Sequence, residues 1–280
     1  MASSDPAALR ARFRELHQSG CFVIPNPWDI GSARYLCHLG FPALATTSSG
    51  FAFTRGLPDG AGAVSRDLVL AHLAEISAAV DVPVNADFES GYARDAQDVA
   101  GNVRLCAAAG VAGLSIEDST GDSAHPLYDL PVAVERLRAA HTALQGSGVL
   151  LTARAECFLT RHPDPLREAV RRLQAYADAG ADVLYAPGLH DLDQIRTVVD
   201  AVSPKPVNVL MSWDAGFRVA DIAATGARRI SVGSGLARAA WGGFLRAARA
   251  LAETGSFAGF RDAELFADLN AFFTGDAQQR

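Results

Sequence analysis

Short apolar runs alternate with longer amphipathic segments along most of this chain. Eight runs rich in branched side chains have the length of β-strands, and they cover residues 21–25, 43–46, 82–87, 113–117, 149–154, 183–185, 207–210 and 229–232. Apolar residues recur at helical spacing between them, as in residues 66–80, 96–109, 130–144, 166–177 and 192–202. Eight strands that alternate with helices predict an α/β protein, a TIM-type (β/α)8 barrel.

Glycines mark the points where the expected helices end. Gly110, Gly180 and Gly226 each follow a helical segment and precede a strand, which is typical of a helix C-terminus. A doubly wound open sheet is the alternative fold. That fold calls for a glycine-rich phosphate turn after an early strand, and this chain has none there.

The 280 residues show no linker or change of composition that would separate two domains. We predict one barrel domain over residues 1–255 and a helical tail over residues 256–280. Apolar residues recur in the tail at near-helical spacing, at Phe257, Phe260, Leu265, Phe266, Leu269, Phe272 and Phe273. This stripe is expected to pack on the chain's own barrel or on a partner protomer.

Composition limits the partners of the protein. The net charge is −6 and the pI is near 5.6, so no basic surface for nucleic acid is expected. The start lacks a signal-peptide pattern and no run of 18 apolar residues occurs, which predicts a cytoplasmic protein with no membrane contact. The four cysteines form no CxxC pair and are interpreted as reduced thiols. Small molecules are therefore the expected ligands.

Charged side chains gather where three of the expected strands end. Asp87 and Glu89 follow one apolar run, Glu117 follows the next, and Arg154 and Glu156 follow the third. Strand C-termini form the active face of a barrel, so these groups are expected to meet there. Carboxylates in such a position are costly unless a cation compensates them, which predicts a divalent metal with an arginine beside it.

Oxygen ligands determine which metal is expected. Asp87, Glu89 and Glu117 offer carboxylates, which suit Mg²⁺ with retained waters, and Mn²⁺ is the second choice. Zinc is not expected, because no HxH, HExxH or CxxC spacing is present. The alternative interpretation is that these acids are helix N-caps or partners of arginines.

The motifs together resemble those of the isocitrate lyase/phosphoenolpyruvate mutase superfamily, over about Phe22 to Trp241. The matching segments are Ser49-Gly50, Gly56-Leu-Pro-Asp59, Asp87-Phe-Glu89-Ser-Gly-Tyr92, Gly110 to Asp118, and Ala153-Arg-Ala-Glu156. In that family these segments are, in order, a turn after the second strand, a gating loop, a metal motif, a Glu-Asp strand and an Ala-Arg-x-Glu strand.

The resemblance implies reactions through a pyruvate-like enolate, and it implies roles for individual residues. Asp87 would be the direct or nearest Mg²⁺ ligand, with Glu89 and Glu117 acting through water. The backbone at Ser49, Gly50 and Phe51 would line the substrate carboxylate or oxyanion. Arg154 would pair with a substrate oxygen, and a structural salt bridge to Glu117 or Glu156 is the other interpretation of this residue.

Two further positions are candidates with plain alternatives. Asp59 would be catalytic by the same resemblance, or it is a turn residue before Gly60. Asn208, on the seventh strand, is a candidate to hydrogen-bond the substrate.

The chain departs from the family's pattern in one loop. Lyases of the family carry a Lys-(Lys/Arg)-Cys-Gly-His loop after the Glu-Asp strand, and the phosphonate enzymes carry lysine, asparagine and serine there. This chain has Ser119-Thr-Gly-Asp-Ser-Ala-His125, with no cysteine and no lysine. His125 is a candidate replacement acid or a surface residue, and P–C bond chemistry loses its expected cations.

We therefore expect a Mg²⁺-dependent carbon–carbon lyase that acts on a small 2-oxo or 2-hydroxy dicarboxylate, such as oxaloacetate or a 2-methylisocitrate-like acid. Tyr92, Glu156 and His125 are the candidate bases for a retro-aldol step. Three alternatives remain: a phosphoenolpyruvate mutase or phosphonopyruvate hydrolase, a metal-dependent pyruvate aldolase of another barrel family, and a barrel that only binds a 2-oxo acid. The resemblance also implies a homo-oligomer, a dimer or tetramer that exchanges a C-terminal helix.

Overall fold

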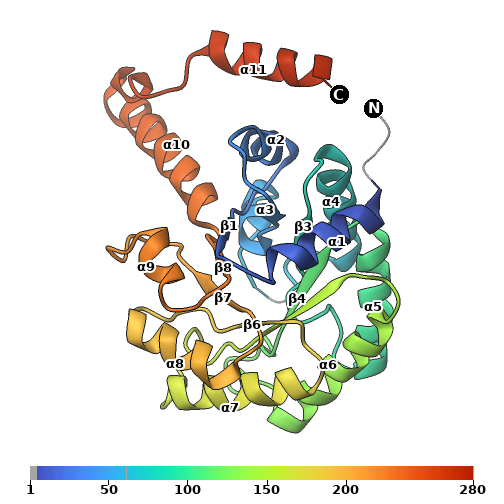
Figure 1. The fold of residues 1–280 in the computed structure, drawn as a ribbon. Coiled ribbons are helices and arrows are strands. Elements are labelled where there is room, and N and C mark those ends of the chain that lie inside the picture. The colour runs from blue at the N-terminus through green and yellow to red at the C-terminus, as the bar shows by residue number, and fades with distance from the viewer. Residues whose placement is uncertain (1–4, 61, 280) are drawn as a thin grey trace.

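Eight short strands lie at the centre of the molecule, and helices surround them (Figure 1). The computed structural model describes residues 5–60 and 62–279. The strands are β1 (Phe22–Ile24), β2 (Leu44–Ala45), β3 (Val84–Asp87), β4 (Gly113–Glu117), β5 (Leu150–Arg154), β6 (Val183–Tyr185), β7 (Val207–Leu210) and β8 (Arg229–Ser231). Each lies within the range that the apolar runs predict.

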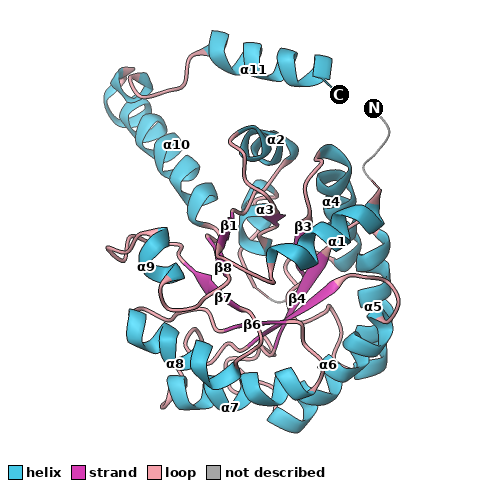
Figure 2. Ribbon diagram, in the orientation of Figure 1, coloured by secondary structure: helices cyan, strands magenta, loops and turns pink. Residues whose placement is uncertain are grey.

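The strands form a parallel sheet that is nearly closed into a barrel. Their order is β1-β8-β7-β6-β5-β4-β3-β2, and every pair is parallel. Between the first and last strands of this order, the Ala45 N–H donates to the Pro25 carbonyl oxygen at 3.0 Å. Figure 2 shows the strands inside and the helices outside. The prediction of a TIM-type (β/α)8 barrel is confirmed.

The helices alternate with the strands along the chain. They are α1 (Pro6–Leu16), α2 (Ile30–His38), α3 (Ser48–Thr54), α4 (Arg66–Ala79), α5 (Ala96–Ala108), α6 (Leu130–Leu144), α7 (Pro165–Asp178), α8 (Leu192–Val202), α9 (Val219–Ala223), α10 (Gly235–Thr254) and α11 (Phe266–Gln279), with a 3-10 turn η1 (Ala258–Phe260). The five helices with predicted ranges agree with those ranges to within one residue at each end.

Polar side chains fix where several helices begin. Asp29 accepts a hydrogen bond from the Ser32 N–H at the start of α2, and Asp191 accepts one from the Gln194 N–H at the start of α8, both at 2.7 Å. At the end of α7, Gly180 has φ +102°, and a Cβ there would lie 2.6 Å from the His141 ring. Glycine is therefore required at this helix-to-strand turn.

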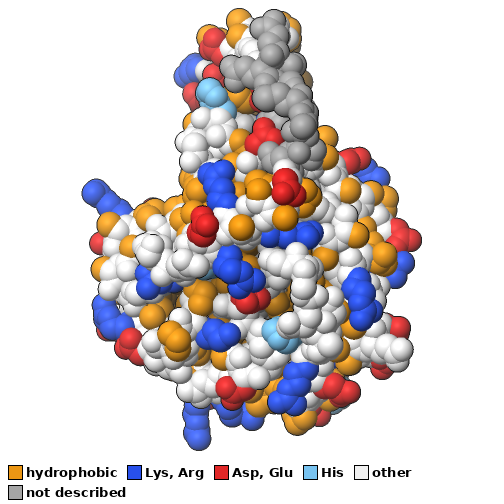
Figure 3. Space-filling model, turned by 45° about the vertical axis from the view of Figure 1, so that its right-hand side comes forward, with side chains coloured by type: hydrophobic (Ala, Val, Ile, Leu, Met, Phe, Trp, Pro, Cys, Tyr) orange, Lys and Arg blue, Asp and Glu red, His pale blue; other side chains and the backbone are white. Residues whose placement is uncertain are grey.

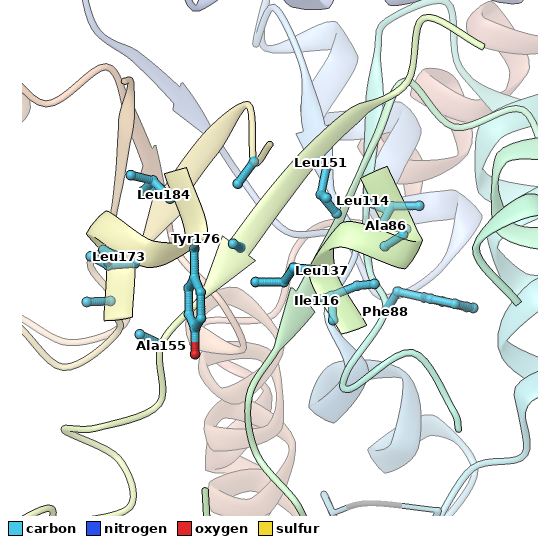
Figure 4. Packing of buried hydrophobic residues seen from close by; sticks show 14 of the residues in the cluster. Ala86, Phe88, Leu114, Ile116, Leu137, Leu151, Ala155, Leu173, Tyr176 and Leu184 are labelled. Atoms are coloured by element: carbon cyan, nitrogen blue, oxygen red, sulfur yellow. The ribbon is translucent and has the colours of Figure 1, made fainter. Parts of the chain in front are cut away.

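Most of the hydrophobic core lies between the barrel and its ring of helices. Figure 4 shows part of it, where Leu137 of α6 and Leu173 and Tyr176 of α7 lie beside the strands. All three side chains are at most 3% exposed. Burial of this kind stabilises the fold by about 25 cal/mol for each Å² of apolar surface.

The amino-terminal end of the barrel is closed by α1. Phe13 is fully buried there, within a small cluster that includes Phe22, Ile24 and Leu150. A Cβ at position 113 would lie 2.6 Å from the Phe13 ring, so Gly113 makes room for this plug. The closed end leaves the carboxyl-terminal mouth as the open face of the barrel.

The last two helices extend beyond the ring formed by the others (Figure 1). On α11, the ring of Phe272 lies 5.1 Å from that of Tyr35 on α2, and Asp276 lies 3.5 Å from Arg34. The tail helix thus packs on α2 of its own chain, although it begins only at Phe266. Exchange between protomers and the boundary at residue 255 stay predictions.

Charged side chains of both signs are scattered over the face shown in Figure 3. Within the described residues, no helix is both long and apolar enough to cross a bilayer. Cys106 and Cys157 are buried thiols, whereas Cys21 and Cys37 are only partly buried.

Candidate active site

A cavity of about 470 Å³ opens at the carboxyl-terminal end of the barrel. It holds several of the predicted site residues together with polar residues from inside the strands. Its polar lining comprises Asn26, Thr46, Thr47, Ser48, Ser49, Asp59, Asn85, Asp87, Ser115, Arg154, Tyr185, Asn208, Ser212, Arg229, Ser231, Ser234 and Arg238. A concave polar site of this size suits a small, highly polar ligand.

Asp87, the last residue of β3, is oriented by the turn that leads into α3. Its Oδ2 accepts hydrogen bonds from the N–H and the hydroxyl of Ser48, both at 2.9 Å. Its own N–H donates to the Thr46 hydroxyl at 2.9 Å. The other carboxylate oxygen, Oδ1, faces Arg154 at 3.6 Å. One oxygen is thus fixed by the chain, and the other faces the charged centre of the site.

Arg154, at the end of β5, lies among three carboxylates. Its Nη1 is 3.2 Å from Glu117 Oε2 and 3.6 Å from Asp87 Oδ1. Its Nε donates to Glu156 Oε1. The carboxylates of Glu156 and Glu117 hold the pKa of Arg154 well above its ordinary value, although burial alone would lower it. Its role as a structural ion-pair partner is therefore present in the structure, and a role in substrate binding stays a prediction.

Carboxylates outnumber cations on this side of the barrel. Burial raises the pKa of Glu89 to about 7 and raises the pKa of Glu117 well above its ordinary value. Asp59 lines the cavity, unlike Glu89 and Glu117, and burial followed by the charge of Asp87 raises the pKa of its carboxyl. Arg154 alone does not neutralise these groups, so a divalent cation would stabilise their charged forms.

The donor set fits Mg²⁺ held partly through water. Across residues 5–60 and 62–279, no three His, Cys, Asp or Glu side chains are close enough together to bind one ion directly. An arrangement with Asp87 as direct ligand and Glu89 and Glu117 acting through water does not require three direct ligands. These oxygen donors suit Mg²⁺ or Mn²⁺, and the assignment of the ligands stays a prediction.

The loop after β3 holds Glu89 in an unusual backbone conformation. Glu89 and Tyr92 have φ values of 45° and 53°, in the left-handed region that non-glycine residues seldom adopt. The Tyr92 hydroxyl donates to Glu89 Oε1 at 2.6 Å. Arg136 of α6 holds the same loop through hydrogen bonds to the carbonyl oxygens of Ser90, Ala93 and Arg94. Strain that neighbouring groups maintain in this way is typical of functional sites.

A buried network supports Glu156 from behind. The Glu156 N–H donates to Asp118 Oδ1 at 2.8 Å. Asp118 Oδ2 accepts from Arg172 Nη1 at 3.0 Å and from the Tyr176 hydroxyl at 2.5 Å. Asp118, the residue after Glu117, thus orients the strand end that carries Arg154 and Glu156.

The predicted catalytic residues divide into three groups. Arg154 and Asp59 line the cavity. Glu156 and Tyr92 lie behind it, bonded to Arg154 and Glu89. His125 is exposed and lines a separate cavity between the loops that follow β4 and β5. The structure therefore does not bring His125 together with the other catalytic candidates.

The predicted substrate-binding residues are also only partly gathered. Ser49 and Asn208 line the cavity. The Gly50 N–H is already bonded to the Thr47 hydroxyl at 3.2 Å, and the Phe51 ring stacks on His72 at 3.9 Å. Ser49 is therefore the only one of the three residues predicted in the turn after β2 that lines the cavity.

Sequence reasoning missed the polar residues inside the strands. Asn85, Ser115, Tyr185, Arg229 and Ser231 all line the cavity. The available signal was the alternation of polar and apolar residues within strands, as in Val84-Asn-Ala-Asp87. Ser48, which orients Asp87, was not predicted as a site residue, although its neighbours Ser49 and Gly50 were.

Fold and site together define a class of protein, a barrel enzyme that gathers carboxylates around an arginine at the open face. The chain belongs to the isocitrate lyase/phosphoenolpyruvate mutase superfamily, because the family model described as phosphoenolpyruvate phosphomutase matches residues 13–252. Relatives in this superfamily include a 2-methylisocitrate lyase and an oxaloacetate decarboxylase, and the chain is an enzyme of the lyase/mutase type.

Three similar proteins illustrate this membership. A solved Burkholderia cenocepacia protein, described as a lyase/mutase of unsettled activity, is 46% identical, with a TM-score of 0.92 over 96% of this chain and 97% of its own. The oxaloacetate decarboxylase of Pseudomonas entomophila is 31% identical over 70% of this chain and 68% of its own. The 2-methylisocitrate lyase of Escherichia coli is 31% identical over 58% of this chain and 56% of its own.

Proposed function

We propose that this chain is a Mg²⁺-dependent lyase that breaks a carbon–carbon bond in a small 2-oxo or 2-hydroxy dicarboxylate, through a pyruvate-type enolate. The observation that carries the proposal is the placement of Arg154 between Asp87 and Glu117 at the open end of the barrel. Negative charge develops on the substrate when a bond to its C3 breaks, and groups fixed in advance stabilise that charge most effectively.

Asp87 would hold the metal directly, and Glu89 and Glu117 would hold it through water. When bound, Mg²⁺ supplies positive charge to the carboxylate and 2-oxo oxygens of the substrate and so favours the enolate. Ser48 keeps one oxygen of Asp87 occupied, which leaves Oδ1 as its available oxygen. Mn²⁺ is expected to replace Mg²⁺ at this site.

The chain's own residues would orient the substrate and move a proton. Arg154 presents a planar guanidinium that matches a carboxylate. Of the two carboxyl candidates, Asp59 lines the cavity and Glu156 does not, so Asp59 would pass a proton from solvent to the enolate. His125 lies in the other cavity and has no part in this scheme.

Carbon–carbon cleavage is favoured over P–C chemistry by the distribution of cations. The chain contains a single lysine, Lys205, and its Nζ donates to the Ala181 carbonyl oxygen just before β6. Lys205 therefore does not replace the loop lysine of the phosphonate enzymes, and the cations that line the cavity are Arg154, Arg229 and Arg238. The names of the two curated relatives, a decarboxylase and a lyase of carbon acids, support the same choice.

The protein is also expected to act as a homo-oligomer, a dimer or tetramer. Large apolar side chains are exposed on the two last helices and between them, including Phe244, Phe257 and Phe266 at 59%, 69% and 83%. Surface of this kind is typical of an interface. Sedimentation of the full chain and of a chain ending at residue 255 tests this expectation, because only the full chain should assemble.

The assay that tests the proposal measures pyruvate or glyoxylate release. Its substrates are oxaloacetate, 2-methylisocitrate, substituted malates and phosphonopyruvate, each with Mg²⁺ and with EDTA. We expect metal-dependent release from one of the carbon acids. Release from phosphonopyruvate alone would establish P–C chemistry instead, and binding without turnover would indicate a non-catalytic 2-oxo acid barrel.

A further inference from the structure

Arg154, the cation that is predicted from the sequence to bind the substrate, already pairs with carboxylates of the chain itself. Arg154 contacts the carboxylates of Asp87, Glu117 and Glu156 at the same time. A substrate with two carboxylates brings two negative charges into a site that is already acidic. At least one of these charges needs a cation that no carboxylate of the chain has neutralised.

Arg229, the first residue of β8, is such a cation. Its side chain points into the barrel, is only 3% exposed, and lines the same cavity as Arg154. Burial lowers the pKa of Arg229 to about 10, so the guanidinium still carries its charge at neutral pH. No carboxylate within residues 5–60 or 62–279 forms an ion pair with it.

All the hydrogen-bond partners of Arg229 are neutral. Nε donates to Asn208 Oδ1 at 2.8 Å, and Nη2 donates to the Thr152 hydroxyl at 3.1 Å. Nη1 lies 3.4 Å from His17 Nε2, and burial lowers the pKa of His17 to about 3, so this ring is uncharged. A guanidinium has five N–H donors, so these three contacts leave two donors available.

Arg229 and Arg154 line the same cavity at different depths. Arg229 contacts Thr152, and Thr152 precedes Arg154 by two residues on β5. Two residues of a strand span about 7 Å, so the cavity extends below the acidic side to the depth of Arg229. Deeper in the barrel, at the level of Leu150 by strand register, Asn85 lines the cavity, and its buried Oδ1 has no hydrogen-bond donor among the described residues. A substrate hydroxyl or a water would supply that donor.

We infer that Arg229, oriented by Asn208, binds the second carboxylate of the substrate at the floor of the cavity and so selects dicarboxylates over monocarboxylates. This inference rests on the proposed function for the substrate class. Arg229 is a binding residue in it, because no bond of the substrate is made or broken at this position.

The first test compares the binding of succinate and butyrate, which share a four-carbon chain and are not cleaved. Calorimetric titration at saturating Mg²⁺ should show that the wild-type protein prefers succinate by at least about tenfold in Kd, as one charge-assisted hydrogen-bonded pair supplies. Arg229→Gln should abolish that preference, and Arg229→Lys should keep part of it. No preference in the wild-type protein would overturn the inference.

The neighbouring arginine provides a matched control. Arg228 faces outward, where its Nη1 donates to the Gly20 carbonyl oxygen, so Arg228→Gln should keep the full preference for succinate. If Arg229→Gln unfolds, Asn208→Asp serves instead, because the new carboxylate would neutralise Arg229 and should abolish the preference in a folded protein. An Arg229→Gln or Asn208→Asp protein that still prefers succinate would show that Arg229 only ties the barrel to α1.

The test of lyase activity is independent of the test of succinate binding. Succinate binding needs no turnover, so a preference that depends on Arg229 in a protein without lyase activity would support the inference and contradict the proposed reaction. If the protein cleaves a dicarboxylate and Arg229→Gln leaves the KM for that substrate unchanged, the proposed reaction would be supported and the inference about Arg229 contradicted.

Discussion

The two sides of the barrel interior carry opposite chemistry. Around the ends of β3, β4 and β5, the side chains of Asp87, Glu117 and Glu156 surround one arginine. Beside β7 and β8, Arg229 donates to the amide oxygen of Asn208 and to the hydroxyl of Thr152 on β5, and no acid among the described residues forms an ion pair with it. The first side suits a metal cation, and the second suits an anion. A dicarboxylate that binds the metal at one end would find both sides complementary.

The largest expected effect comes from removing the acid that the chain orients most firmly. Asp87→Ala should lower kcat/KM for the active dicarboxylate about a thousandfold, or about 4 kcal/mol, because the metal loses its direct ligand. Steady-state kinetics at several Mg²⁺ concentrations measure this loss. Asp193→Ala, at an exposed acid of α8, is the control and should be fully active. If the Asp87→Ala enzyme is active, the metal does not bind on the acidic side.

Acid should destabilise the protein through His17, beneath Arg229. Burial lowers the pKa of His17 to about 3, from about 6.5 in the unfolded chain. Between these values the unfolded chain binds one more proton, so stability falls as the pH falls through this window. Urea unfolding at pH 7 and pH 4 should show that the stability of the wild type relative to His17→Gln falls by about 3 kcal/mol, a comparison in which the other titrating groups cancel.

The exposed His190 is the control for that measurement. His190→Gln should keep the wild-type dependence of unfolding on pH. A His17→Gln protein that loses stability with acid as steeply as the wild type would show that the ring is not held neutral beside Arg229.

Replacing Arg154 by lysine tests whether the acidic side needs its planar cation. A lysine keeps the charge, but it cannot donate to Asp87, Glu117 and Glu156 together. Arg154→Lys should lower kcat/KM about a hundredfold and leave the fold intact by circular dichroism. A loss below about threefold would assign Arg154 a role in charge balance alone.

The smallest expected effect concerns the hydroxyl that supports Glu89. Tyr92→Phe removes the 2.6 Å hydrogen bond to Glu89 Oε1, a contact worth about 1 kcal/mol. The Mg²⁺ concentration for half-maximal activity should therefore rise about fivefold. Tyr35→Phe, on α2, should leave it unchanged. A Mg²⁺ dependence identical to that of the wild type would show that Glu89 does not contribute to metal binding.

The acidic side was predictable from the sequence, because charged residues directly follow apolar runs. Asp87, Glu117 and Arg154 end β3, β4 and β5 as that pattern indicates, and the eight-stranded barrel follows from the same runs. The strand pattern places a residue near the mouth, but it does not say where a side chain in the following loop lies. For this reason Asp59 was placed at the cavity only by resemblance, and His125 was grouped with the catalytic residues although it lies in another cavity.

The β7–β8 side was largely missed for a physical reason. Arg229 follows another arginine at the start of a strand, where charged residues usually face solvent. Only the register of β8 against β7, which pairs Arg229 with Asn208, turns one arginine inward and leaves the other outside. Register depends on contacts between distant segments, and one sequence does not reveal it.

The division of the barrel into two sides is tested most directly by measuring two ligands on two variants. Mn²⁺ binding and succinate binding would be titrated on the wild-type protein, Asp87→Ala and Arg229→Gln. We expect Asp87→Ala to lose Mn²⁺ binding, and Arg229→Gln to keep Mn²⁺ binding at wild-type affinity while losing the preference for succinate over butyrate. Loss of Mn²⁺ binding in a folded Arg229→Gln protein, or its retention in Asp87→Ala, would contradict the account.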